Sequence, residues 1–293
     1  PEIEKMTFRY VPEPSTRLAM LQSGEADIIE LFSGQAPIIR KDPNFRLHLT
    51  KYVAGTGLGF ADLATPNKPS PFHDIRVREA LSLAIDRKVI CDRFLFGAAE
   101  PYGALLSPIS PGHRDIAPDP YDPKRAKKLL SEAGYPNGFE TVVNCHPGTK
   151  LWLEPIAFSL ADVGIKAKLQ VWEMGSYGEA FRTKKLSGII FAGSWSSAQT
   201  DWHGLDTWHY SKYPWTYYST PEIDGAIEKS YMAKSKNEVA KWGQIIEDLI
   251  IKDRTKVQLW TRHDACALSN RISKWEPPVG ALPTSHFEYL EFK

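Results

Sequence analysis

The strongest constraint on the fold is a regular alternation of strand-like and helix-like segments over residues 140–195. Short runs rich in Val, Ile and aromatic residues alternate with longer segments whose apolar residues recur at helical spacing. The predicted order is strand, helix, strand, helix, strand, at 140–145, 151–164, 165–172, 176–186 and 188–195. Such a βαβαβ unit needs parallel strands joined by crossover helices, so the sequence predicts an α/β fold.

The segment before this unit carries further strand and helix signals. Residues 6–11 alternate like a strand, Ser15 is the predicted N-cap of a helix that ends at Gly24, and residues 26–29 follow as a second strand. One long helix is predicted over residues 75–95 with Asp74 as its N-cap. These signals extend the α/β pattern toward the beginning of the chain.

Helix signals also lie on either side of the alternating unit. A helix is predicted to start at Asp122-Pro123 and to close at Gly134. Further helices are predicted from Thr220-Pro221 and from the capping box Ser235 to Glu238, before a strand at about 257–268. The five prolines of residues 101–121 predict an irregular connection.

Composition excludes several classes of protein. With 293 residues, 42% of them hydrophobic, the chain can form one large domain or two ordinary ones. A net charge of +1 argues against nucleic-acid binding, and the basic run at 124–128 is expected to be a solvated helix face. Cys91, Cys145 and Cys266 allow at most one disulfide. No apolar run approaches the length of a membrane span, and the first residues lack the pattern of a signal peptide.

Common catalytic and cofactor motifs are absent from the sequence. There is no Walker A motif, no H-E-x-x-H and no G-x-S-x-G, and we expect no cofactor. The run 55–59 (GTGLG) opens no predicted helix, so a glycine-rich strand or hinge is favoured over a dinucleotide site. His113 and His146 are interpreted as turn residues, and Cys145 as a buried apolar residue.

Residues 194–219 (SWSSAQTDWHGLDTWHYSKYPWTYYS) contain four of the nine Trp residues. The rings either bury the backbone of a long loop or line a ligand cleft, and both interpretations stay open. His203 and His209, with Asp201 and Asp206, also allow a metal site, and Ser196 or Ser197 with His203 a nucleophile. We favour neither the metal site nor the serine nucleophile. Metal-binding residue pairs usually have tighter spacing, and the sequence indicates no oxyanion hole.

Residues 71–87 (PFHDIRVREALSLAIDR) resemble the signature of family 5 extracellular solute-binding proteins of ABC importers. The segments PSTRLAMLQSGEADII, YDPKRAKKLLSEAGYPNGFE and YYSTPEIDGAIEKS resemble further elements of that family in the same order. The resemblance implies a class II periplasmic-binding-protein-like α/β fold with two lobes, the first lobe incomplete. The implied division is 1–107 for part of lobe I, 108–261 for lobe II and 262–293 for the return to lobe I. We therefore expect a shortened form of a longer protein.

The resemblance also implies a function. The chain would capture a small organic solute, a peptide or a peptide-like molecule between its lobes and deliver it to the permease subunits of an importer, with no catalysis and no metal site. The alternatives are a nickel-type receptor for a metal complex and the sensing domain of a regulator. The implied location is periplasmic or extracellular, and the protein would associate with the membrane only by binding the permease.

The same resemblance directs attention to the aromatic stretch. Peptide binders of the family hold the peptide amine with an Asp three residues after a tryptophan, and Ala198 stands there. Free-amine peptides are thus less favoured as solutes, unless Asp201 takes over. The predicted ligand-binding residues are Trp195, Ser196, Ser197, Asp201, Trp202, Trp208 and Tyr210. Arg76, Arg78, Asp86 and Arg87 are expected to be structural, with the guanidinium groups bound to carboxylates and carbonyls.

Overall fold

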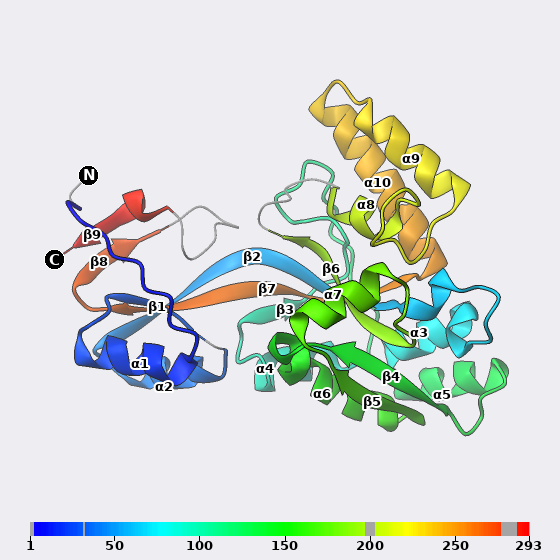
Figure 1. Ribbon diagram of the computed structural model, residues 1–293, viewed down its shortest axis with the longest axis horizontal. Helices are drawn as coiled ribbons and strands as arrows, with labels where there is room; N and C mark the ends of the chain where they lie inside the picture. The colour runs from blue at the N-terminus through cyan, green and yellow to red at the C-terminus, as the bar shows by residue number, and fades with distance from the viewer. Residues whose placement is uncertain (1–2, 32, 197–202, 277–285, 293) are drawn as a thin grey trace.

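The computed structural model describes residues 3–31, 33–196, 203–276 and 286–292 and divides into a smaller and a larger body (Figure 1). The smaller body contains helices α1 and α2, strand β1 and the hairpin of β8 and β9. The long antiparallel strands β2 and β7 run from one body into the other, and the larger body contains the remaining elements. The helices are α1 (Pro14–Ser23), α2 (Ala36–Lys41), α3 (Ile75–Leu83), α4 (Arg87–Arg93), α5 (Pro123–Glu132), α6 (Pro147–Ala161), α7 (Met174–Arg182), α8 (His203–His209), α9 (Pro221–Tyr231) and α10 (Lys236–Asp253). The strands are β1 (Ile28–Glu30), β2 (Phe45–Phe60), β3 (Ala99–Pro101), β4 (Phe139–Cys145), β5 (Ile165–Val171), β6 (Ile189–Ser196), β7 (Lys256–Ser269), β8 (Ile272–Trp275) and β9 (Leu290–Phe292).

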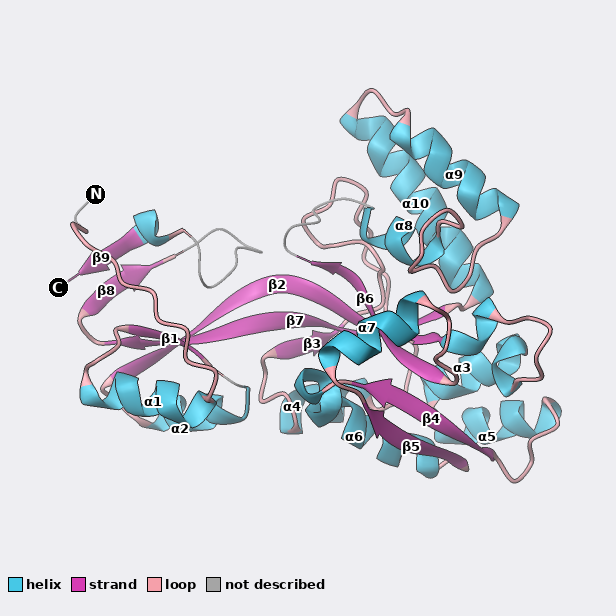
Figure 2. Ribbon diagram, viewed as in Figure 1, coloured by secondary structure: helices cyan, strands magenta, loops and turns pink. Residues whose placement is uncertain are grey.

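A mixed sheet connects the two bodies. Its strand order is β1-β7-β2-β6-β4-β5, and β3 pairs with β7. β4 pairs in parallel with both β5 and β6, as the predicted βαβαβ unit requires, whereas β2 is antiparallel to β6 and β7. The prediction of an α/β fold is confirmed, and Figure 2 shows helices packed along the sheet of the larger body.

Side-chain alternation along β7 explains how the smaller body is held together. Ala265 and Ala267 point into a cluster with Leu21 and Ile39 of the two helices. Cys266 and Leu268 point to the other face, where they pack with Trp275 and Leu290 of the hairpin. Successive side chains of a strand face opposite sides, so one strand supplies both halves of this small core.

The main core of the larger body joins segments that are far apart in sequence. Leu58 and Phe60 of β2 and Leu81 and Ile85 of the α3 region pack in one cluster with Ile165 of β5. A second cluster joins residues 105 and 106 to α8, α9 and α10. The predicted lobe boundary at 107 therefore falls inside the larger body, whereas the one at 261/262 falls within β7. The division itself stays a prediction.

The crossing between the bodies coincides with an irregularity of register. Thr50 pairs with Asp264, but Ala54 pairs with Arg262, so β2 contains two more residues than β7 over this stretch. Bulges of this kind bend a strand and increase its local twist. The paired strands thus change direction where they leave the smaller body.

The glycine-rich run 55–59 lies inside β2, with β6 on one side and β7 on the other. A Cβ at Gly57 would stand 2.8 Å from the carbonyl oxygen of Val257 and 3.1 Å from that of Ala192. Only glycine fits between such close backbones. The interpretation of this run as a strand rather than a phosphate loop is confirmed.

Several local predictions about helices are confirmed. The Asp74 side chain accepts a hydrogen bond from the Arg76 backbone amide, and Asp122 caps α5 in the same way through Arg125. The Ser235 hydroxyl accepts from the Glu238 amide, although the Glu238 carboxylate reaches the Lys234 amide instead of the Ser235 amide. Caps are recognisable in sequence because they depend on neighbouring residues only.

Other predictions about the first hundred residues are wrong. The helix predicted over 75–95 is two helices, because Asp86 caps a new helix by accepting from the Val89 amide. Residues 6–11 form no strand, since alternation without a pairing strand does not create one. The first helix begins at Pro14 with Glu13 as its N-cap rather than Ser15, and β1 pairs antiparallel with β7 instead of running parallel to a strand at residues 6–11.

The arginines of the family-like segment bind backbone carbonyls, as predicted. Arg78 donates to the carbonyl oxygens of Phe72, His73, Asp253 and Arg254. Arg87 donates to those of Ser82, Ile85, Asp119 and Gln258, and burial lowers its pKa to about 10. These guanidinium groups tie α3 and α4 to the start of β7.

Candidate solute-binding site

The predicted binding residues cluster in sequence around the carboxyl end of β6. Trp195 and Ser196 are the last two residues of that strand, and their side chains lie outside what the structure describes, as does that of His203. Ser197, Asp201 and Trp202 lie outside the described residues altogether, and so does Ala198. Their role in binding stays a prediction. The backbone of β6 nevertheless fixes where this segment leaves the sheet.

Trp208 and Tyr210 pack against neighbouring helices. The Trp208 ring on α8 stands edge-on to Phe181 of α7, with 5.1 Å between ring centres. Tyr210 is 7% exposed, packs with the α9–α10 cluster and donates its hydroxyl to the Glu228 carboxylate at 3.1 Å. Both contacts anchor the aromatic stretch to the protein, and a ligand-binding role for either residue stays a prediction.

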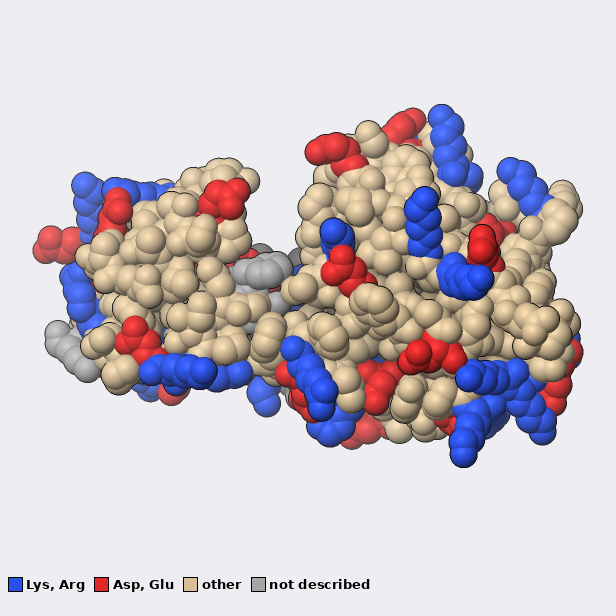
Figure 3. Space-filling model, turned by 90° about the horizontal axis from the view of Figure 1, so that it is seen from below, with Lys and Arg blue, Asp and Glu red and all other residues tan. Residues whose placement is uncertain are grey.

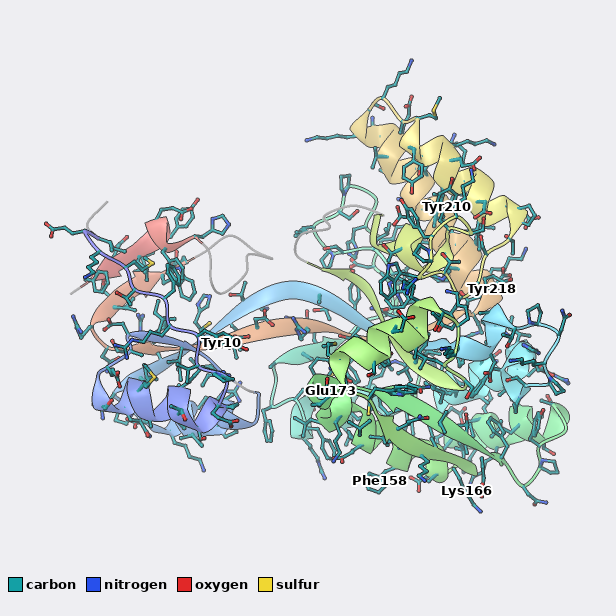
Figure 4. The ribbon with its side chains drawn as sticks, in the orientation of Figure 1. Tyr10, Phe158, Lys166, Glu173, Tyr210 and Tyr218 are labelled. Carbon is teal, nitrogen blue, oxygen red and sulfur yellow. The ribbon has the colours of Figure 1, made fainter. Side chains whose placement is uncertain are left out.

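The rest of the aromatic stretch is also held by internal contacts. The hydroxyl of Tyr217 donates to the Phe181 carbonyl at 2.8 Å, and that of Tyr218 to the Asp253 carboxylate at 2.9 Å. Figure 4 shows Tyr210 and Tyr218 among α8, α9 and α10. For residues 204–219, packing therefore accounts for most of the rings whose side chains are described.

A buried lysine lies beneath this segment. Lys256, the first residue of β7, is 8% exposed, and its ammonium donates to the carbonyl oxygen of Gly193 on β6. The same nitrogen lies 5.5 Å from the centre of the Trp208 ring, a cation–π contact. Burial lowers the pKa of Lys256 to about 7, because water no longer solvates the charge.

His209 is held in a way that leaves its ring no free nitrogen for a metal. Nδ1 lies 2.9 Å from the Leu205 carbonyl oxygen and Nε2 lies 3.2 Å from the Thr255 hydroxyl. Burial lowers the pKa of His209 to about 3, and the nearby positive charge of Lys256 contributes to the same decrease. Among the residues that the structure describes, no group of three His, Cys, Asp or Glu side chains could hold a metal ion. The three cysteines are all buried and unpaired.

A second group of rings lies at the carboxyl end of β4, beside the first residues of β6. His146, directly after β4, has its ring centre 5.9 Å from that of Tyr177 and 6.4 Å from that of Phe191. Trp152 lies 6.1 Å from Phe191, and the Arg262 guanidinium lies 5.9 Å from the Trp152 ring centre. Burial lowers the pKa of His146, which favours its neutral form. Ligands in α/β sheets bind outside the carboxyl ends of the strands, which makes this group a candidate wall of a binding site.

Most of this group was not predicted from the sequence. His146 was expected to be a turn residue, and Trp152, Phe191 and Arg262 carry no motif that singles them out. The available signal was the position of His146 directly after the predicted strand 140–145. Arg262 could not be found this way, because only the pairing of β7 in the sheet brings it to α6.

A separate groove lies on the outer side of the larger body. Its lining includes Glu140, Thr141, Glu154, Phe158, Lys166 and Lys168, from β4, α6 and β5. Figure 4 shows Phe158 and Lys166 at the edge of the molecule away from Tyr210. This groove is thus distinct from the end of β6.

Comparison with known proteins identifies the fold as that of class II periplasmic binding proteins. The DppA periplasmic binding protein from Helicobacter pylori, solved with the peptide STSA, superposes with a TM-score of 0.81 over 97% of this chain and 56% of its own, at 23% identity. NikA from Brucella suis, solved with Fe(III)-EDTA, superposes with a TM-score of 0.82 over 97% of this chain and 61% of its own, at 20% identity.

The chain belongs to the bacterial extracellular solute-binding proteins, family 5, whose model matches residues 1–223. The glutathione-binding protein GsiB of Salmonella choleraesuis is 28% identical over 273 residues, 88% of this chain and 52% of that protein. The chain spans about half the length of the curated relatives it matches. The predicted resemblance to family 5 and the predicted fold class are confirmed.

Basic and acidic side chains are interspersed over the face that Figure 3 shows. None of the helices in the described ranges combines the length and the apolar composition needed to cross a bilayer.

Proposed function

We propose that the chain is part of the substrate-binding component of an ABC importer, which captures a peptide or peptide-like organic solute and delivers it to the permease. The observation that carries the proposal is the family match over residues 1–223, combined with two bodies joined by β2 and β7. The relative named as glutathione-binding and the neighbour solved with a peptide support this class of solute. The proposed location is the periplasm or the cell exterior, with membrane association only through the permease.

The solute would bind between two lobes that close by hinge motion. We keep residue 262 as the point of return to the first lobe and propose the 50–54 segment of β2 as the first crossing, in place of residue 107. The registers of Thr50 and Ala54 support this choice, because the bulge between them lies where the paired strands leave the smaller body. A solute that contacts both lobes only in the closed state stabilises that state, so binding is coupled to closure without any bond being broken.

Calorimetric titration with three probes tests the proposal. Glutathione and the peptide Ser-Thr-Ser-Ala represent the proposed solutes, and Fe(III)-EDTA represents the metal-complex alternative. We expect a peptide probe to bind and to raise the melting temperature, with about 2.7 kcal/mol of stabilisation at a hundredfold excess over Kd. Binding of the chelate alone would favour the metal-complex receptor, and turnover of a probe would indicate an enzyme.

A further inference from the structure

The ammonium of Lys256 occupies an unusual place in the sheet. Lys256 lies on β7 and Gly193 on β6, and β2 separates these two strands. The lysine side chain therefore reaches across β2 to donate to the Gly193 carbonyl oxygen, and the Trp208 ring covers its nitrogen at 5.5 Å. A side chain held on both sides in this way has a fixed position beside the last residues of β6.

This ammonium is short of partners within the described part of the chain. It has three N–H donors, and among the described residues one carbonyl oxygen, that of Gly193, accepts a hydrogen bond from it, with no ion pair to a described carboxylate. His209 of α8, whose pKa is lowered by burial and by the charge of Lys256, is neutral at physiological pH. A buried charge without an opposite charge is costly, and a buried ionisable group with a shifted pKa, such as Lys256, is a candidate for a functional site.

The Lys256 ammonium also lies where a solute is expected to bind. Gly193 lies two residues before Trp195 at the carboxyl end of β6, and ligands in α/β sheets bind beyond such ends. The sequence from Gly193 to Thr200 contains no charged residue, so this part of the chain supplies no carboxylate of its own.

We propose that Lys256 binds a carboxylate of the solute, so that the site prefers solutes carrying an anionic group next to the end of β6. This inference rests on the proposed function and specifies the charge of the solute. A carboxylate there would accept the free N–H groups of Lys256 in a setting from which water is largely excluded. Hydrogen bonds between charged groups are short and strong in such settings.

Two peptides that differ only in the C-terminal carboxylate measure the contribution of that group to binding. Ser-Thr-Ser-Ala and its C-terminal amide differ in one charged group, and titration calorimetry on the 293-residue protein measures both affinities. We expect the free acid to bind about 10- to 100-fold more tightly than the amide, the range for hydrogen bonds to charged groups. In Lys256→Met the two peptides should bind equally, at the affinity of the amide, whereas Lys256→Arg should keep a preference for the acid.

Lys184→Met is the matched control. Lys184 also donates to a backbone carbonyl, that of Pro214, and lies 4.2 Å from the centre of the Tyr217 ring, so these partners belong to the 204–219 segment rather than to β6. Its replacement should leave the preference for the acid unchanged. Circular dichroism at the temperature of the titration confirms that each variant is folded, and Met is an unbranched apolar replacement of similar length.

The outcomes separate this inference from the proposed function. Equal binding of acid and amide by the unmodified protein, or an acid preference that survives in Lys256→Met, overturns the inference and leaves the proposed function standing. An acid preference that emerges only in Asp201→Asn also overturns it, because Asp201 would then be the counter-charge of Lys256. If neither peptide binds, the peptide form of the proposed function fails and the inference fails with it.

Discussion

Replacing Glu247 by Ala should loosen the proline-rich connection from the larger body. The carboxylate is fully buried on α10 and accepts from the backbone amides of Leu105 at 2.6 Å and Leu106 at 3.0 Å. It also accepts from the Arg114 guanidinium at 2.8 Å. The substitution would leave two amides and a partly buried cation without this acceptor. Removing one partner of a buried charge pair costs about 3–5 kcal/mol, and we expect a loss of unfolding free energy in that range.

Urea denaturation measures this loss, and amide hydrogen exchange at Leu105 and Leu106 localises it. Asp248→Ala is the matched control, because Asp248 also pairs with Arg114, at 2.6 Å, but its side chain is 61% exposed. An exposed pair contributes about 0–1 kcal/mol, so this variant should be close to the unmodified protein. A loss below about 1 kcal/mol in Glu247→Ala, with unchanged exchange, would contradict this role of Glu247, since unsatisfied buried groups cost about 1–3 kcal/mol each.

Three further predictions concern the sheet, the acid stability and the aromatic stretch. Gly57→Ala should destabilise the protein by about 1–3 kcal/mol, because its Cβ meets backbone oxygen at 2.8 Å; Gly59→Ala, which meets the flexible Ile190 side chain at 3.3 Å, should cost less in the same urea titration. The pKa of His209 is about 3 in the folded state, against 6.5 as its ordinary value, so the unfolded state binds more protons and stability falls as pH drops from 6.5 toward 3. His209→Gln should reduce this loss between pH 6.5 and 4.5 by up to about 3 kcal/mol, at about 1.4 kcal/mol per pH unit, and equal losses in both proteins would contradict the assignment. Trp195→Ala should weaken solute binding with little change in melting temperature, whereas unfolding of the larger body would identify Trp195 as a core residue.

The local patterns of the sequence predicted much of the larger body. The βαβαβ unit, the caps at Asp74 and Asp122 and the strand over 257–268 depend on residues close to one another, and the structure contains all of them. The predictions that failed depend on distant partners. Polar and apolar side chains alternate over residues 6–11 as in a strand, but this segment pairs with no strand of the described chain. β1 is antiparallel to its neighbour because β7 comes from the other end of the sequence.

The candidate site could be predicted only in part. The end of β6 is visible in the sequence because a strand pattern stops there and an aromatic stretch begins. Lys256 gives no such signal, since a lysine after a helix is usually solvated and only the β7-β2-β6 order brings it to Gly193. The Arg262 contact with Trp152 depends on the same pairing. The site residues on β7 can thus be found only from the pairing of strands in the sheet, whereas those on β6 can be predicted from the local sequence.

Native mass spectrometry of the gently purified protein, before and after incubation with glutathione and Ser-Thr-Ser-Ala, tests the central proposal most directly. We expect a one-to-one complex with an intact organic solute, whether it is carried from the host or added. A spectrum of the protein alone under every condition, or conversion of an added peptide to products, would contradict it.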